Sequence, residues 1–174
     1  TAPVAKDCGI MGSFFAGNGE IGMHLAILSG SVYGTADLVA DEAADRCREA
    51  GLMVTRVKPA SVDALLEAAP DAILGCVSTT GMGELPDSFM PFFVTLRDRF
   101  PLFTGKPFAV IALGDSAYGD TFCQGGEQLR ELLLELQAAE ALPMLRLDAS
   151  ETVSPELDAG PWIEQLVAVM GRHT

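Results

Sequence analysis

The chain has 174 residues, of which 49% are hydrophobic, and this is enough to build one domain with a buried core. No apolar run reaches the roughly 20 residues that span a bilayer, and the formal net charge of −13 opposes binding to nucleic acid or anionic lipid. The four scattered cysteines argue against a zinc site or a disulfide framework and favour a reducing cytoplasm.

Residues 1–22 are rich in glycine and other small residues and have no clear periodicity. They lack the basic segment that opens a secretory signal. Met23 stands directly before the first apolar run. We therefore expect residues 1–22 to be a non-native or poorly ordered extension, and residues 23–174 to form the domain.

From Met23 onward, short apolar runs alternate with amphipathic stretches. Five strands are expected, at residues 24–28, 52–57, 71–77, 106–113 and 144–148. Helices are expected at residues 35–50, 61–69, 88–100, 124–139 and 161–170. This alternation predicts an α/β fold, a doubly wound sandwich in which helices cover both faces of a five-stranded parallel sheet of order 2-1-3-4-5.

Helical spacing predicts which side chains of these helices face the sheet. In the first helix, the expected inward residues are Leu38, Val39, Ala43, Cys47 and Ala50. In the third, they are the apolar residues Phe89, Phe92, Phe93, Leu96 and Phe100.

A small, hydroxyl-rich loop separates the first strand from the first helix, with the sequence Leu28-Ser29-Gly30-Ser31-Val32-Tyr33-Gly34-Thr35-Ala36. Such a loop directs backbone N–H groups and a helix N-terminus at one point, which suits an anion. Ser29, Ser31 and Thr35 add hydroxyl donors, and the loop contains no Lys or Arg. Neither the Walker pattern nor the dinucleotide fingerprint is present. The pattern fits either a phosphate-binding loop or an ordinary strand-to-helix turn.

Two further loops are expected at the same edge of the sheet, because the loops after strands one, three and four meet there in this strand order. Residues 78–87 contain Gly81 and Gly83, where the backbone can approach a flat ligand. Residues 114–123 place Tyr118 among small and acidic side chains. The three loops together predict a site for a phosphorylated, planar, aromatic ligand.

These motifs resemble the flavodoxin family over about residues 26–170. Within the family, the chain is most similar to the short MioC-type flavodoxin-like proteins. The resemblance rests on Ser29-Gly30-Ser31, Ser78-Thr79-Thr80-Gly81, Leu85-Pro86-Asp87 and Thr121-Phe122-Cys123. It extends to the FMN domains of diflavin reductases, in which G-S-x-T-G-T-A stands in the place of residues 30–36. Flavodoxin with FMN is itself a known example of a ligand bound where strand order reverses.

The resemblance implies FMN as the cofactor and assigns roles to residues of the three loops. The phosphate would be bound by the hydroxyls of Ser31 and Thr35 and by the N–H groups of Val32, Tyr33 and Gly34. Tyr33 departs from the family, where a Thr is common. The hydroxyl of Ser29 is a further candidate.

The flavin ring would lie between the second and third loops. Ser78, Thr79, Thr80 and Gly81 would line one edge, and the segment from Gly81 through Gly83 to Glu84 would supply a carbonyl to the flavin N5. Thr80 departs from the Tyr or Trp of many relatives. Tyr118 would stack on the ring, and the resemblance places Gly114, Asp115, Phe122, Cys123 and Asp148 at flavin and ribityl contacts.

The resemblance implies an electron-transfer protein and not an enzyme. Electrons would arrive from an NADPH-dependent flavodoxin or ferredoxin reductase and leave to an acceptor enzyme, which for MioC-type proteins includes a biotin synthase system. The acidic residues Glu84, Asp87, Asp115 and Asp120 either guide the basic face of such a partner or form an ordinary solvated rim. Two alternatives stay open: a flavin-dependent NAD(P)H reductase, and a flavin-free interaction scaffold.

Overall fold

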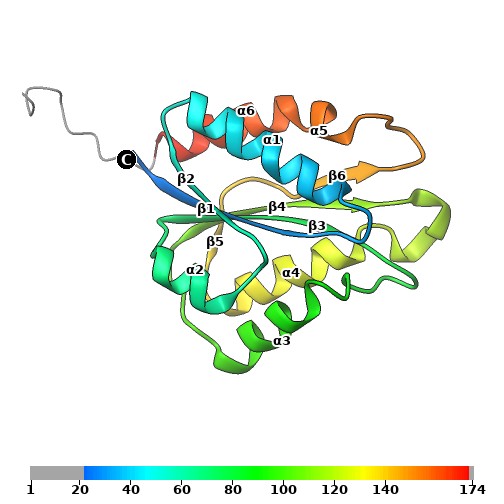
Figure 1. Ribbon diagram of the computed structural model, residues 1–174, viewed down its shortest axis with the longest axis horizontal. Helices are drawn as coiled ribbons and strands as arrows, with labels where there is room; N and C mark the ends of the chain where they lie inside the picture. Colours follow the sequence, from blue (N-terminus) through cyan, green and yellow to red (C-terminus); the bar gives the residue numbers. More distant parts are fainter. Residues whose placement is uncertain (1–21, 173–174) are drawn as a thin grey trace, which may run out of the picture.

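A parallel β-sheet forms the middle layer of the computed structural model, which describes residues 22–172 (Figure 1). Its strands are β1 (His24–Gly30), β2 (Met53–Val57), β3 (Ala72–Ser78), β4 (Pro107–Gly114), β5 (Ala139–Glu140) and β6 (Leu145–Asp148). The order is β2-β1-β3-β4-β5, and β6 pairs with β4 as well. The predicted order is confirmed, with β6 as the expected fifth strand. Residues 1–21 of the expected extension lie outside the described residues.

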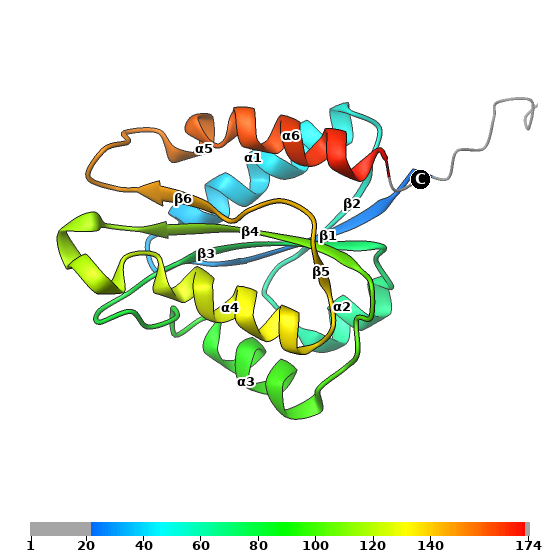
Figure 2. The same ribbon diagram turned by 180° about the vertical axis from the view of Figure 1, so that it is seen from behind.

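Helices cover both faces of this sheet (Figures 1 and 2). One face carries α1 (Thr35–Glu49), α5 (Pro155–Asp158) and α6 (Gly160–Met170). The other carries α2 (Val62–Ala68), α3 (Met90–Arg99) and α4 (Gln124–Glu135). The doubly wound sandwich is therefore confirmed.

The central strands are buried on both sides. In β1, Leu25 and Ile27 pack in the cluster under α1 and α6, whereas Ala26 and Leu28 pack in the cluster over α3 and α4. All four are fully buried. This two-sided burial explains why the strands are continuous apolar runs.

Two short elements differ from the prediction. The helix expected over residues 124–139 ends at Glu135, Gln137 has a φ of 69°, and residues 139–140 form the two-residue strand β5. The one-turn helix α5 precedes α6 where a loop was expected. Elements of two or four residues are too short to produce a periodic pattern.

Three side chains expected to face the sheet do not. Leu38 is 58% exposed, on the solvent side of α1, and Ala50 is exposed because it follows the last residue of that helix. Phe100 is 47% exposed, since its φ of 47° takes the chain out of α3 one residue earlier than predicted.

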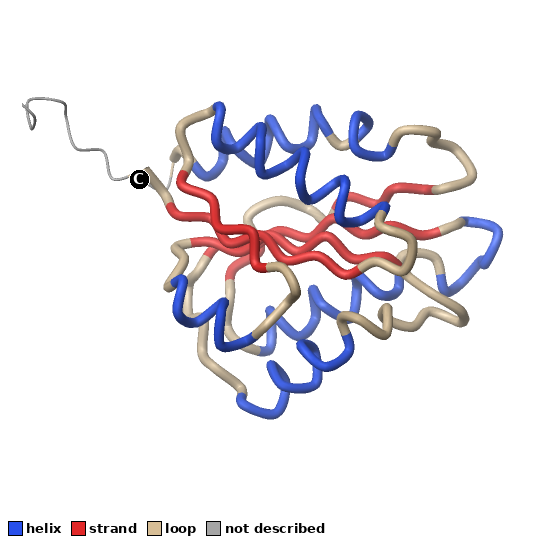
Figure 3. The backbone as a smooth tube through the Cα atoms, viewed as in Figure 1, coloured by secondary structure: helices blue, strands red, loops and turns tan. Residues whose placement is uncertain are grey.

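The carboxyl ends of the strands lie at one edge of the sheet. In the register, Gly30 of β1 pairs with Val77, Ser78 of β3 pairs with Leu113, and Gly114 of β4 pairs with Asp148. The loops that follow these strands therefore leave the sheet side by side, at the right of Figure 3.

Candidate functional site

A cleft of about 350 Å³ opens where these loops meet. Its volume lies within the range of small-molecule sites in proteins. Fourteen residues from the three loops and the end of β6 line it: Ser31, Val32, Tyr33, Thr35, Ser78, Thr79, Thr80, Gly81, Leu113, Gly114, Asp115, Tyr118, Thr121 and Ala149. We call it the cleft below.

The first wall is formed by residues 30–35, which we call the phosphate loop because the sequence predicts that it binds a phosphate. A Cβ atom on Gly30 would lie 2.6 Å from the Cβ of Phe89, so the loop can follow this path only with glycine there. Gly34 has a φ of 87° and caps α1. The Ser31 hydroxyl oxygen accepts hydrogen bonds from the N–H groups of Gly34, at 2.9 Å, and Ala36, at 3.3 Å. A polar oxygen therefore already lies at the N-terminus of α1.

Further donors of the phosphate loop face no acceptor. Within residues 22–172, the N–H groups of Val32, Tyr33 and Thr35 have no hydrogen-bond partner. They lie at the positive end of α1, which attracts an anion. The loop has no Lys or Arg. These neutral donors fit a phosphate group.

The second wall is a tight turn after β3. Thr80 and Glu84 form an antiparallel bridge, in which each N–H donates to the other carbonyl at 2.8 Å. Gly81, with a φ of 50°, and Gly83, with a φ of 98°, allow the chain to reverse there. The Gln128 side chain of α4 donates to the Gly83 carbonyl at 2.7 Å. The turn is thus fixed from behind, with Thr80 and Gly81 in the cleft.

Thr79 connects this wall to α4. Its hydroxyl accepts the Gly125 N–H at 3.0 Å, and a Cβ atom on Gly125 would lie 2.8 Å from the Ser78 carbonyl oxygen. The start of α4 therefore packs tightly against the end of β3, which fixes the floor of the cleft.

The third wall is the 3₁₀ helix at Ser116–Thr121. The Asp115 carboxylate accepts the Ala117 N–H at 2.8 Å and caps this helix. Asp148 accepts the Ser116 N–H at 3.1 Å and the Ser150 N–H at 2.9 Å. Hydrogen bonds from Ser116, and then Ser150, hold the pKa of Asp148 well below its usual range. The wall presents Tyr118, which is 65% exposed.

The structure brings most of the predicted site residues to the cleft. They are Ser31, Val32, Tyr33, Thr35, Ser78, Thr79, Thr80, Gly81, Gly114, Asp115 and Tyr118. Leu113, Thr121 and Ala149 also line it and were not predicted. Leu113 and Ala149 lie at the carboxyl ends of β4 and β6, and this position in the sequence could have indicated that they line the cleft.

Six predicted residues lie outside the lining. Gly34 and Gly83 shape the first and second walls, and Asp148 fixes the third. Phe122 lies behind Gly114, close to where a Cβ atom there would stand. Ser29 is 9% exposed, and its hydroxyl donates to Asp37 at 2.6 Å. That hydroxyl belongs to a polar network behind the phosphate loop.

Cys123, the sixth, is fully buried, with its thiol 3.5 Å from the Ala112 carbonyl oxygen. Burial raises the pKa of Cys123 and of Cys47 to about 11, and that of Cys76 to about 12. These thiols stay protonated near neutral pH, so they act as small apolar side chains.

The raised thiol pKa values predict a loss of stability at alkaline pH. Above pH 9 the thiols of the unfolded chain ionise while the buried ones keep their protons, so the free energy of unfolding falls as the pH rises toward 11. In the variant Cys76→Ala, we expect the free energy of unfolding to fall less steeply with pH, the slope being smaller by up to about 1.4 kcal/mol per pH unit. Urea unfolding between pH 7 and 11 measures both slopes, and equal slopes would contradict the prediction.

Exposed apolar side chains lie on all three loops. Tyr33, which is 94% exposed, and Tyr118 line the cleft, and Met82, which is 81% exposed, follows Gly81 on the second wall. Glu84 and Asp120 are exposed on the same loops. A ligand in the cleft would stay within reach of another protein.

The fold and the cleft define a doubly wound α/β protein with a small-molecule site, which has unpaired neutral N–H donors on one wall and an aromatic ring on another. The sequence of residues 27–162 matches the profile of the flavodoxin family, and the chain belongs to that family. Flavodoxins bind FMN and transfer electrons, and they are not enzymes. The predicted family, cofactor and class of activity are thereby confirmed.

Relatives and solved structures agree with this assignment. A solved mutant of a flavodoxin from Pseudomonas aeruginosa is 55% identical, with a TM-score of 0.82, and the match covers 86% of this chain and 99% of that one. Flavodoxin YqcA of Escherichia coli is 38% identical over 142 residues, or 82% of this chain and 95% of the relative. Protein MioC of the same species is 29% identical over 148 residues, or 84% and 97%.

In the part of the chain that the structure describes, no helix has the length and apolar character needed to cross a membrane. Nor does any group of three or more His, Cys, Asp or Glu side chains within residues 22–172 form a potential metal site.

Proposed function

We propose that this flavodoxin receives electrons from an NADPH-dependent flavodoxin or ferredoxin reductase and passes them to an acceptor enzyme. Bound FMN supplies the redox chemistry, and the protein supplies binding, orientation and access. The observation that carries the proposal is the cleft. It combines unpaired N–H groups, which suit a phosphate, with an opening at which Tyr33 and Tyr118 are exposed.

In this proposal, the phosphate loop binds the FMN phosphate. Ser31 and Thr35 contribute hydroxyls, and the unpaired N–H groups at residues 32, 33 and 35 contribute the remaining donors. Tyr118 packs against the flavin ring, and the turn between Thr80 and Glu84 places backbone groups at its edge.

The acidic residues around the cleft support a partner with a basic face. Glu84, Asp87 and Asp120 are exposed, and Asp115 is half-buried. Their charges speed the encounter with a basic protein and make its rate depend on salt. Exposed apolar side chains such as Met82 would then contact the docked partner.

The test is to load the protein with FMN, remove free FMN by gel filtration, and follow flavin absorbance without oxygen. We expect bleaching by NADPH only after a ferredoxin–NADP reductase is added. Bleaching by NADPH alone would favour a direct reductase, and loss of FMN on the column would favour a flavin-free scaffold.

A charge variant tests the proposed docking face. We expect Glu84→Gln combined with Asp120→Asn to slow reduction by the reductase by about threefold at low salt, and less at high salt. Asp98→Asn on α3 is the matched control for loss of an exposed carboxylate, 66% of whose side chain is accessible. Equal rates for all three proteins would contradict a role for these acidic residues.

A further inference from the structure

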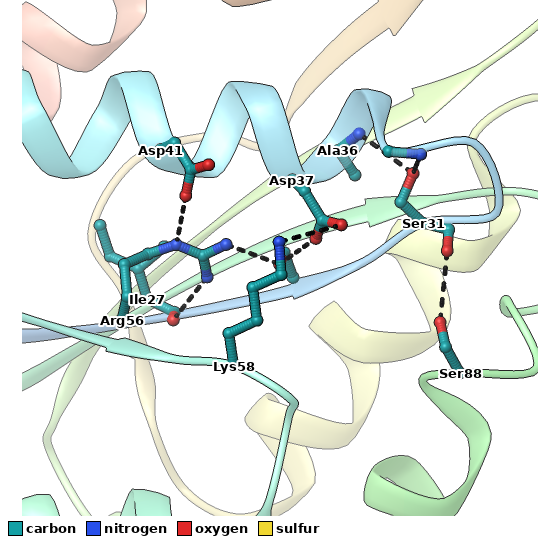
Figure 4. A network of polar contacts seen from close by, with 10 residues as sticks. Ile27, Ser31, Ala36, Asp37, Asp41, Arg56, Lys58 and Ser88 are labelled. Carbon is teal, nitrogen blue, oxygen red and sulfur yellow. Dashed lines mark hydrogen bonds and ion pairs between the residues drawn. The ribbon is translucent and has the colours of Figure 1, made fainter.

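A polar network lies behind the phosphate loop (Figure 4). We call it the loop network, and it consists of Ser29, Asp37, Asp41, Arg56 and Lys58. Its central residue, Arg56 of β2, has a side chain that is only 12% exposed. Neither the phosphate loop nor the cleft lining includes a Lys or Arg. Arg56 and Lys58 of the loop network are therefore the cations to consider behind the loop.

The Arg56 guanidinium makes three hydrogen bonds in three directions. It donates to the Asp41 carboxylate at 2.9 Å, to the Ile27 carbonyl at 3.2 Å and to the Ser29 hydroxyl at 3.0 Å. Ile27 and Ser29 belong to β1, and Asp41 belongs to α1. One planar side chain thus connects β2, the end of β1 and α1, which a lysine could not do with the same geometry.

Ser29 connects Arg56 to Asp37, the residue of the loop network that follows the phosphate loop in the sequence. Its hydroxyl donates to Asp37, in the first turn of α1, and Lys58 lies 3.5 Å from the same carboxylate. Ser29 comes just before the phosphate loop, and Asp37 comes just after it. The loop network therefore fixes the distance between the two ends of the loop that carries the unpaired N–H groups.

The loop network also balances charge. Asp37 lies in the first turn of α1, beside the proposed phosphate position, and Asp41 lies one turn further along the helix. Lys58 and Arg56 offset these two carboxylates. Loss of the Arg56 charge would leave a net negative charge beside the phosphate. Both effects, geometric and electrostatic, would change the binding of the phosphate. They would leave the contacts of the flavin ring unchanged, because Arg56 does not line the cleft.

We propose that Arg56 is a positioning residue for the FMN phosphate, acting through Ser29 and Asp37 on the phosphate loop and offsetting the carboxylates behind it. The proposal rests on the proposed binding of phosphate by this loop. Arg56 itself does not line the cleft.

The test compares FMN with riboflavin, which lacks the phosphate, by fluorescence titration. We expect Arg56→Gln to weaken FMN binding by about tenfold, the size of one charge-assisted hydrogen bond, and to change riboflavin binding by less than about twofold. Arg56→Lys keeps the positive charge but loses the planar guanidinium group, and we expect its FMN affinity to lie between those of Arg56→Gln and the unmodified protein. Ser29→Ala, which leaves Arg56 and Asp41 paired, should weaken FMN binding selectively by a smaller factor.

Arg99→Gln is the matched control, because Arg99 pairs with Asp63 at 2.6 Å at the far end of α3. It should leave both affinities unchanged. Equal losses for FMN and riboflavin in Arg56→Gln, or no loss for either, would overturn the proposal. If Arg56→Gln does not fold, Ser29→Ala decides by the same comparison. If the unmodified protein itself binds FMN no better than riboflavin, the phosphate loop fails as the phosphate site.

Discussion

Replacing Phe89 with alanine is expected to lower the free energy of unfolding by about 3–5 kcal/mol and to weaken FMN binding. Phe89 is fully buried, with its ring centroid 5.0 Å from that of Phe92. It also fills the space beside Gly30, where a Cβ atom would touch it. Truncation would leave a cavity directly under the phosphate loop.

The effect on FMN follows from the position of Phe89 directly against Gly30 of the phosphate loop. The neighbouring Ser88 hydroxyl donates to the Ser31 carbonyl at 3.3 Å, which connects the segment before α3 to the phosphate loop. A collapsed or shifted Phe89 site would disturb both Gly30 and this bond. The donors of the phosphate loop would then no longer converge.

Urea unfolding of the FMN-free protein measures the loss of stability, and FMN titration measures the loss of affinity. Phe100→Ala is the matched control, because it removes the same ring from a position that is 47% exposed. Its cost should stay below about 1 kcal/mol. Similar costs for the two variants would show that Phe89 is not a core residue.

The large elements of this fold are predictable because their sequence patterns are strong. Strands such as β3, buried on both faces, are continuous apolar runs, and the buried residues of α1 recur at helical spacing. The patterns fail where local backbone geometry decides. Phe100 has the spacing of an inward residue, but its left-handed φ turns the chain away from α3 first.

The candidate site was predictable at the level of loops and less so at the level of side chains. Topology alone places the ends of β1, β3 and β4 together, so most cleft residues follow from counting strands. Ser29 shows the limit. Its hydroxyl pairs with Arg56, 27 residues away in the sequence, and no local pattern indicates that partner.

Replacing Thr35 with aspartate is expected to weaken FMN binding by about a thousandfold. Thr35 is the first residue of α1 and lines the cleft. A carboxylate there would lie beside the proposed position of the phosphate. Two unit charges about 4 Å apart repel by about 4 kcal/mol near a protein surface, and the phosphate carries more than one. Riboflavin, without the phosphate, should bind as before.

Thr35→Asp should weaken FMN binding without lowering the stability of the protein. A carboxylate in the first turn of a helix interacts favourably with the helix dipole, by about 0.3–1 kcal/mol. The free energy of unfolding of the FMN-free variant should therefore be unchanged or slightly raised. Loss of FMN binding could then not be attributed to unfolding.

Two control variants separate charge from shape and position. Thr35→Asn has nearly the shape of the aspartate variant without its charge, and we expect it to retain most of the FMN affinity. Thr95→Asp adds the same charge at an exposed site on α3 and should have no effect. Salt should restore little binding to Thr35→Asp, because the charges lie closer than the screening length of about 8 Å. A loss smaller than tenfold would mean that the phosphate lies elsewhere in the cleft, and the proposed role of Arg56 would fall with it.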